Sequence, residues 1–184
     1  MAVMLAMPAR WTCRPYSVAA AERLSAALGV SPTLAAILAR RGYESIEDAR
    51  RFMAADECHD PWRLFDMRTA CSTILGHVER GSRILVHGDY DVDGVCSTAV
   101  LIRTLRALGA APAWHLPSRF DGGYGLSRET VAWVVDAGTG LLLTADCGIT
   151  CLAEIEEATA RGMDVVVTDH HRPSERLPGC PTVH

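Results

Sequence analysis

Short apolar runs alternate with helical patterns from about residue 66 onward, and this alternation restricts the fold more than any other feature. The expected strands are 83–87, 112–116, 140–145 and 164–168. The expected helices are 66–80, 95–108, 127–136 and 151–161. Apolar strands that are separated by helices form parallel sheets with both faces covered. The sequence therefore predicts an α/β domain with a parallel, Rossmann-like sheet flanked by helices.

The first 65 residues have a different pattern, in which short helices are separated by loops. Ser17, Ser31 and Ser45 each precede a helical pattern, and serine is a favoured residue at the start of a helix. We therefore expect an N-terminal α-helical region at 1–65 and the α/β domain at 66–184.

Composition narrows the class of protein. The net charge of −4 argues against a protein that coats nucleic acid by charge alone. All 18 basic residues are Arg, which suits bidentate phosphate contacts, but their scatter along the chain favours a biased composition as the reason. The seven cysteines form no CxxC pair, which favours reduced thiols and a cytoplasmic location. Because the chain has no apolar run of about 18 residues, no membrane span is expected.

Clusters of carboxylates and imidazoles follow three of the expected strands. They read HGDYDVDG at 87–94, DCG at 146–148 and DHH at 169–171. In a parallel sheet, ligands bind beyond the carboxyl ends of the strands, so we expect the clusters to meet there. The ligand-type side chains are those of His87, Asp91, Asp93, Asp146, Asp169, His170 and His171.

So many acidic groups at one edge would repel one another unless cations lay among them. Carboxylates mixed with imidazoles suit Mn²⁺, and also Zn²⁺ or Fe²⁺, whereas carboxylates alone suit Mg²⁺ better. Two cations about 3.5–4 Å apart can clamp the attacking and leaving oxygens of a phosphoryl displacement. The sequence thus predicts a two-metal phosphoesterase site. Gly88, Gly94 and Gly148 are expected to permit tight turns and the close approach of a phosphate.

Each cluster taken singly also has a plain structural explanation. A lone Asp-x-Asp-Gly is usually a turn or a helix cap, and a calcium loop that begins at Asp89 would need Glu where Val100 stands. The remaining histidines lack ligand-like neighbours in the sequence and are expected on the surface or in the core; they are His59, His77, His115 and His184. His115 also ends an expected strand, which is the position from which a side chain can face the site.

The order and spacing of these motifs resemble the DHH phosphoesterase superfamily and, within it, the RecJ family of single-strand exonucleases. The similar segments are HDPWRLFDM at 59–67, ILVHGDYDVDG at 84–94, LPSRFDGGYGL at 116–126, TADCGI at 144–149 and VTDHH at 167–171. The resemblance spans about residues 50 to 178. Gly122 departs from it, since an acidic residue is expected there.

The resemblance implies roles for individual residues. His87 and Asp91 would hold one metal, Asp93 and His170 would hold the other, and Asp146 would bridge the two. Asp91, Asp93, Asp146, His170 and His171 would form the catalytic set, with a metal-activated water as nucleophile.

Further roles follow from the same resemblance. His171 would face the scissile phosphate. Asp89 and Asp169 would orient the metal ligands without contacting the metal themselves. Arg119 is expected to contact a phosphate, and Tyr124 to stack on a base.

The activity implied by the resemblance is 5′ to 3′ hydrolysis of single-stranded DNA in repair and recombination. It would use two divalent cations, Mn²⁺ or Mg²⁺, in a monomer whose partner is single-stranded DNA. The family has a further metal-binding aspartate and a substrate-gripping domain well beyond the DHH motif. We therefore expect the domain at 66–184 to be C-terminally incomplete and its activity alone to be impaired.

Two alternatives remain open. One is a different DHH phosphodiesterase that acts on oligonucleotides, cyclic dinucleotides or pyrophosphate. The other is a non-catalytic remnant that keeps the fold and serves as a binding module.

Overall fold

The computed structural model describes residues 12–118 and 125–184. The chain divides into two compact units between His59 and Asp60. The domain boundary expected after residue 65 stays a prediction. Within the described residues, no helix is long and apolar enough to cross a membrane.

The first unit contains three short helices. They are α1 (Val18–Leu28), α2 (Pro32–Arg40) and α3 (Ile46–Ala54). Ser17, Ser31 and Ser45 cap them, each accepting a hydrogen bond from the backbone N–H three residues later, as expected from the sequence. Leu24 and Leu38 fill a small core that is otherwise rich in alanine.

The second unit is built on a parallel sheet with the strand order β2-β1-β3-β4-β5. Its strands are β1 (Ile84–Gly88), β2 (Ala113–His115), β3 (Leu141–Ala145), β4 (Asp164–Thr168) and β5 (Thr182–Val183). The predicted α/β fold with a parallel sheet is confirmed. The strand expected at 112–116 is shorter than predicted, and β5 adds an edge strand near the end of the chain.

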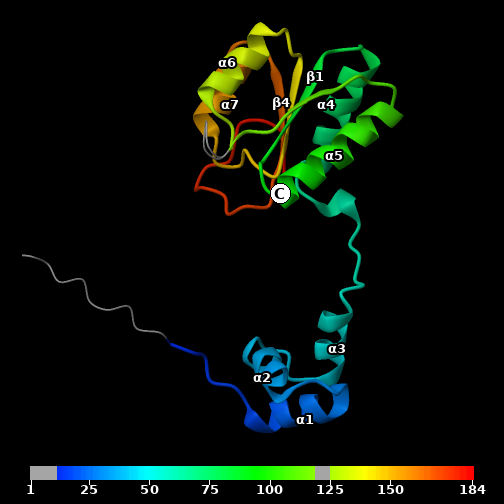
Figure 1. Ribbon diagram of the computed structural model, residues 1–184, viewed down its shortest axis with the longest axis vertical. Helices are drawn as coiled ribbons and strands as arrows, with labels where there is room; N and C mark the ends of the chain where they lie inside the picture. Colours follow the sequence, from blue (N-terminus) through cyan, green and yellow to red (C-terminus); the bar gives the residue numbers. More distant parts are fainter. Residues whose placement is uncertain (1–11, 119–124) are drawn as a thin grey trace, which may run out of the picture. The chain divides into compact units, whose positions relative to one another are not determined.

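Helices cover both faces of this sheet (Figure 1). One face carries α4 (Met67–Glu79) and α5 (Val92–Ala107), and the other carries α6 (Arg128–Asp136) and α7 (Leu152–Ala160). A short 3₁₀ helix, η1 (Pro61–Arg63), precedes α4.

Alternate residues of each central strand pack into different cores. Val86 and Leu143 belong to the cluster beneath α4 and α5. Leu85 and Leu142 belong to the cluster beneath α6 and α7. Because both faces are buried, the strands need apolar side chains at successive positions, which explains the unbroken apolar runs in the sequence.

The helix expected at 95–108 begins three residues earlier, at Val92, so that prediction was wrong at its start. Asp91 is the N-cap, and its Oδ1 accepts a hydrogen bond of 3.0 Å from the N–H of Gly94. The second half of the HGDYDVDG motif is therefore a helix start rather than a free loop. Asp93 lies in the first turn of α5.

Candidate metal centre

The neighbouring strands β1, β3 and β4 bring the three sequence clusters together at one edge of the sheet. Two groups of side chains there have ligand atoms within 4.8 Å of one another. The groups are Asp146 with His170 and His171, and Asp146 with Asp89 and Asp91. Asp146 belongs to both, which is the position that a bridging ligand needs.

Asp146 has an unusual environment for a carboxylate. Its side chain is buried, yet neither oxygen has a hydrogen-bond partner within the described chain. His170 Nε2 lies 2.9 Å from Oδ1, but without the geometry of a hydrogen bond. Burial raises the pKa of Asp146, and the nearby charge of Asp91 raises it further. A buried carboxylate without hydrogen bonds is costly, so this donor set fits a divalent cation.

Asp169 anchors the loop that carries the two histidines. Its Oδ1 accepts hydrogen bonds from the N–H groups of His170 and His171, and its Oδ2 accepts one of 2.9 Å from the N–H of Ile149. Burial alone would raise the pKa of Asp169, but these hydrogen bonds outweigh it and lower the pKa. Asp169 thus acts as an anion that fixes the loop.

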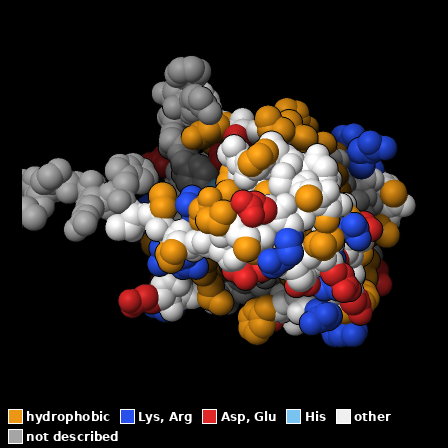
Figure 2. Space-filling view, turned by 90° about the horizontal axis from the view of Figure 1, so that it is seen from below, with side chains coloured by type: hydrophobic (Ala, Val, Ile, Leu, Met, Phe, Trp, Pro, Cys, Tyr) orange, Lys and Arg blue, Asp and Glu red, His pale blue; other side chains and the backbone are white. Residues whose placement is uncertain are grey.

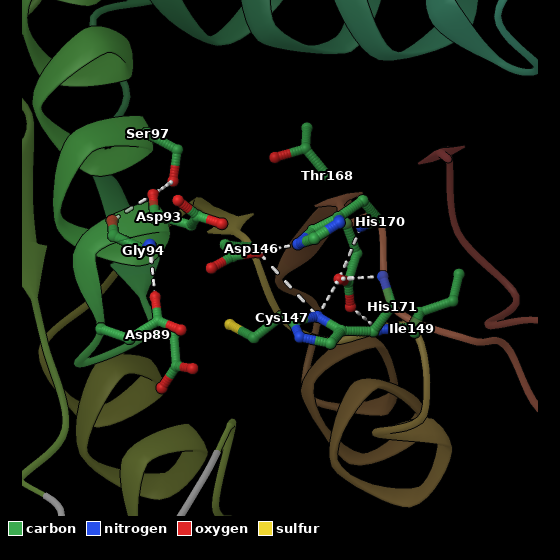
Figure 3. A network of polar contacts seen from close by, with 12 residues as sticks. Asp89, Asp93, Gly94, Ser97, Asp146, Cys147, Ile149, Thr168, His170 and His171 are labelled. Carbon is green, nitrogen blue, oxygen red and sulfur yellow. Dashed lines mark hydrogen bonds and ion pairs between the residues drawn. The ribbon is translucent and has the colours of Figure 1, made fainter. Parts of the chain in front are cut away.

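His171 is oriented by the same carboxylate. Its Nδ1 lies 2.8 Å from Asp169 Oδ1, and this hydrogen bond raises the pKa of His171. Figure 3 shows the rings of His170 and His171 side by side, on the side of Asp146 opposite Asp93. Asp146 thus lies between Asp93 and the two histidines (Figure 3).

The first cluster contributes its carboxylates from the turn into α5. The backbone N–H of Gly94 lowers the pKa of Asp91 by its hydrogen bond to the carboxylate. Asp89 is buried, and its Oδ1 accepts from the N–H of Tyr90 at 2.7 Å. Asp93 lines the same cavity as Asp146 but belongs to neither close group.

His87 is placed differently from what the resemblance implies. It is fully buried and belongs to neither close group. Its Nε2 lies 3.2 Å from the carbonyl oxygen of Gly125, and its Nδ1 lies 3.1 Å from Nδ1 of His115. Burial lowers the pKa of His87 to about 4, so the ring is neutral. Both nitrogens have protein partners here, and a role as metal ligand stays a proposal.

Two histidines that were expected to lack ligand-type neighbours have such neighbours in the structure. His115 stacks on His87 with ring centroids 5.1 Å apart, so it does have a ligand-type neighbour. His184 lines a cavity of about 580 Å³ together with Asp93, Asp146 and His170. Both residues were expected to lack such company. Neither histidine belongs to a sequence motif. Their ligand-type neighbours come from strands far apart in the sequence, so only the paired strands bring them together.

Gly88 and Gly94 serve the packing of β1 against α5. A Cβ on Gly94 would lie 2.4 Å from the backbone oxygen of Asp89, and a Cβ on Gly88 would lie 2.0 Å from Thr98 Oγ1. The glycines therefore let the strand end and the helix start approach each other closely. Gly148 has a φ of +105°, as a tight turn requires.

Arg119, Gly122 and Tyr124 lie outside the described residues. The contacts expected of Arg119 with a phosphate and of Tyr124 with a base stay predictions.

A parallel α/β domain with carboxylates and imidazoles gathered at the carboxyl ends of its strands is the arrangement of a metal-dependent hydrolase. Residues 83–184 match the family model described as DHH family, N-terminal domain, and the chain belongs to this family.

Relatives of this chain include RecJ exonucleases. The chain is 34% identical to the single-stranded-DNA-specific exonuclease RecJ of Bacillus subtilis over 95% of its own length and 22% of that protein. It is 39% identical to RecJ of Thermus thermophilus over 89% of its length and 23% of that protein. The chain thus spans about a quarter of the length of these relatives.

Solved structures give the same result. A crystal structure of exonuclease RecJ bound to manganese is 41% identical, with a TM-score of 0.65 over 69% of this chain and 33% of that one. RecJ from Thermus thermophilus in complex with Mn²⁺ is 35% identical, with a TM-score of 0.64 over 94% of this chain and 24% of that one. The recognition of a RecJ-like DHH domain from the sequence is confirmed.

Proposed function

We propose that the chain carries the metal-binding part of a RecJ-type exonuclease, which hydrolyses single-stranded DNA from the 5′ end in repair and recombination. The observation that supports this most directly is Asp146, a buried carboxylate without hydrogen-bond partners that belongs to two candidate ligand groups. Such a group is costly in a folded protein unless a cation binds it.

Two divalent cations would share Asp146 in this proposal. His170, with Asp93 close to the same cavity, would complete one site, and Asp89 or Asp91 would complete the other. The mixture of imidazole and carboxylate favours Mn²⁺, and Mg²⁺ is the alternative. If His87 joins the second site, as the resemblance implies, its ring must leave the carbonyl of Gly125.

The cations would supply Lewis-acid polarisation of the phosphate and a lowered pKa of water. The residues of the chain orient the reactants. Asp169 holds His171 by its Nδ1, so the ring is presented at the site in a fixed orientation. His171 would then contact the scissile phosphate, and Asp91 and Asp93 would stand opposite it at the start of α5.

Single-stranded DNA is the proposed substrate because the RecJ relatives are named for it. Figure 2 shows acidic and basic side chains interspersed on the visible face, without a continuous basic surface. Because the net charge of the chain is −4, recognition would depend on the metal site rather than on charge alone. We also propose a monomer that acts in the cytoplasm, where the seven free cysteines would stay reduced.

Calorimetric titration of the 184-residue chain with Mn²⁺, followed by assays on 3′-labelled single strands, tests the proposal. Two bound ions, the second of them weak, are expected, together with slow shortening of single strands but not of duplexes, because the activity of this part alone is expected to be impaired. Cleavage of only dinucleotides, cyclic dinucleotides or pyrophosphate would indicate a different DHH enzyme. One bound ion without any hydrolysis would support the binding-module alternative for this chain, and absence of Mn²⁺ binding would overturn the metal site itself.

A further inference from the structure

His184 lies beside the loop that carries the DHH motif because the backbone places it there. Strand β5 pairs with β4 in a parallel register that sets Val183 opposite Thr168. The N–H of Asp169 donates a 3.1 Å hydrogen bond to the carbonyl oxygen of Val183. The residue after Val183 is therefore held next to residues 169–171 by the sheet itself.

The side chain of His184 contacts that loop directly. Its Nε2 lies 2.7 Å from the backbone oxygen of His171. A carbonyl oxygen only accepts hydrogen bonds, so Nε2 carries the proton and donates it. His184 also lines the cavity that contains Asp146 and His170.

The loop is consequently held from both neighbouring strands. On the side of β3, the N–H of Ile149 donates to Asp169 Oδ2 at 2.9 Å. On the side of β5, His184 donates to the carbonyl of His171. His170 lies between these two attachments and points toward Asp146, with Nε2 2.9 Å from Oδ1.

We propose that His184 is a positioning residue for the metal centre. By holding the carbonyl of His171, it limits the movement of residues 169–171 and keeps His170 directed at Asp146. The effect on the loop is independent of any metal, whereas the effect on metal affinity rests on the proposed function. Groups that orient a metal ligand without contacting the ion commonly change metal affinity when they are substituted.

Substitutions at position 184 can separate the hydrogen bond from the bulk of the ring. In His184→Gln, the amide nitrogen can occupy nearly the place of Nε2 and still donate. In His184→Leu, similar volume is kept and the donor is lost. His59→Leu is the matched control, since it removes an exposed histidine from the first unit.

Amide exchange by NMR without metal provides the first measurement. In His184→Leu, the amides of His170 and His171 should exchange about two- to fivefold faster, as expected for one lost hydrogen bond at an exposed position. The amide of Asp169 reports the β4–β5 pairing and should not change. His184→Gln and His59→Leu should behave like the unsubstituted chain.

The second measurement is Mn²⁺ affinity by calorimetry. We expect the affinity to fall about two- to fivefold in His184→Leu and to stay unchanged in the other two variants. Unchanged exchange of His170 and His171 in His184→Leu would overturn the proposal, as would equal acceleration in His184→Gln. Faster exchange of Asp169 would also overturn it, because the effect would then come from loss of β5. If exchange changes as expected but no variant binds Mn²⁺, the positioning role stands and the proposed metal function fails.

Discussion

His170 Nε2 lies 2.9 Å from Asp146 Oδ1, and this pair joins the end of β4 to the end of β3. The histidine is mostly exposed, whereas the aspartate side chain is 4% exposed. The aspartate therefore comes from the rigid floor of the site, and the histidine comes from a loop that needs other contacts to hold it. Two ligands held so differently should respond differently to substitution.

Asp146→Asn should lower Mn²⁺ affinity at least about tenfold, because it removes the charge shared by both candidate groups. Without metal, the same change should raise Tm by about 2–4 °C, since a buried carboxylate without hydrogen bonds is removed. Asn suits the backbone here, where φ is +65°, better than Ala would. Calorimetry and thermal unfolding in EDTA measure the two effects.

The control for this substitution is Asp56→Asn, which removes an exposed carboxylate from the first unit. It should change neither quantity. Equal Mn²⁺ affinity in Asp146→Asn and the unsubstituted chain would contradict the bridging role.

Gly94→Ala should destabilise the second unit by about 3 kcal/mol or more, because the new Cβ would lie 2.4–2.6 Å from backbone atoms of Asp89. Backbone atoms at the end of β1 cannot move aside without disturbing the sheet. Gly179→Ala is the matched control, since nothing lies within 4 Å of its Cβ position. Urea unfolding of both variants measures the difference, and equal midpoints would show that the close packing is not required.

Acid should weaken the fold through His87. Burial lowers the pKa of His87 from 6.5 to about 4, an effect that His115 reinforces and the hydrogen bond to Gly125 opposes. Between these two pH values the unfolded chain binds a proton that the folded chain does not, so the free energy of unfolding decreases as pH falls. The part of this decrease in the free energy of unfolding that comes from His87 should reach about 3 kcal/mol below pH 4.

Urea unfolding in EDTA between about pH 7 and pH 4 measures this dependence. In His87→Gln the amide can still donate to Gly125, and the pH dependence should be flatter than in the unsubstituted chain. All other side chains are the same in both proteins, so the difference between the two curves comes from the change at His87. Parallel curves would refute the assignment.

Mn²⁺ should slow the alkylation of Cys96, because this exposed thiol lines the cavity that contains Asp93 and Asp146. Cys58 is exposed in the first unit and should react at the same rate with or without the ion. Cys147 is buried, and burial raises the pKa of its thiol, so it should stay unmodified in the folded protein.

Mass spectrometry after brief iodoacetamide treatment gives the extent of labelling at each cysteine. Protection of Cys58 equal to that of Cys96 would show a general effect of the ion rather than occupancy of the cavity.

Much of the fold was predictable because its signals are local. Ser127 begins α6 as expected, since a serine can accept from the N–H of Thr130 in any helix. The strands were recognisable because burial on both faces requires continuous apolar residues. The start of α5 differs from the expected one because Asp91, a ligand-type side chain in the motif, also caps the helix with its carboxylate.

The sequence by itself determined the elements, the family resemblance and the side chains that could bind a metal, because periodicity, caps and motifs depend on neighbours along the chain. Only the tertiary structure decided which of these side chains meet. Strand order and register place Asp146 in both ligand groups, turn His87 toward Gly125 and His115, and set His184 against the carbonyl of His171. These contacts join residues far apart in sequence, and they depend on packing that local patterns do not encode.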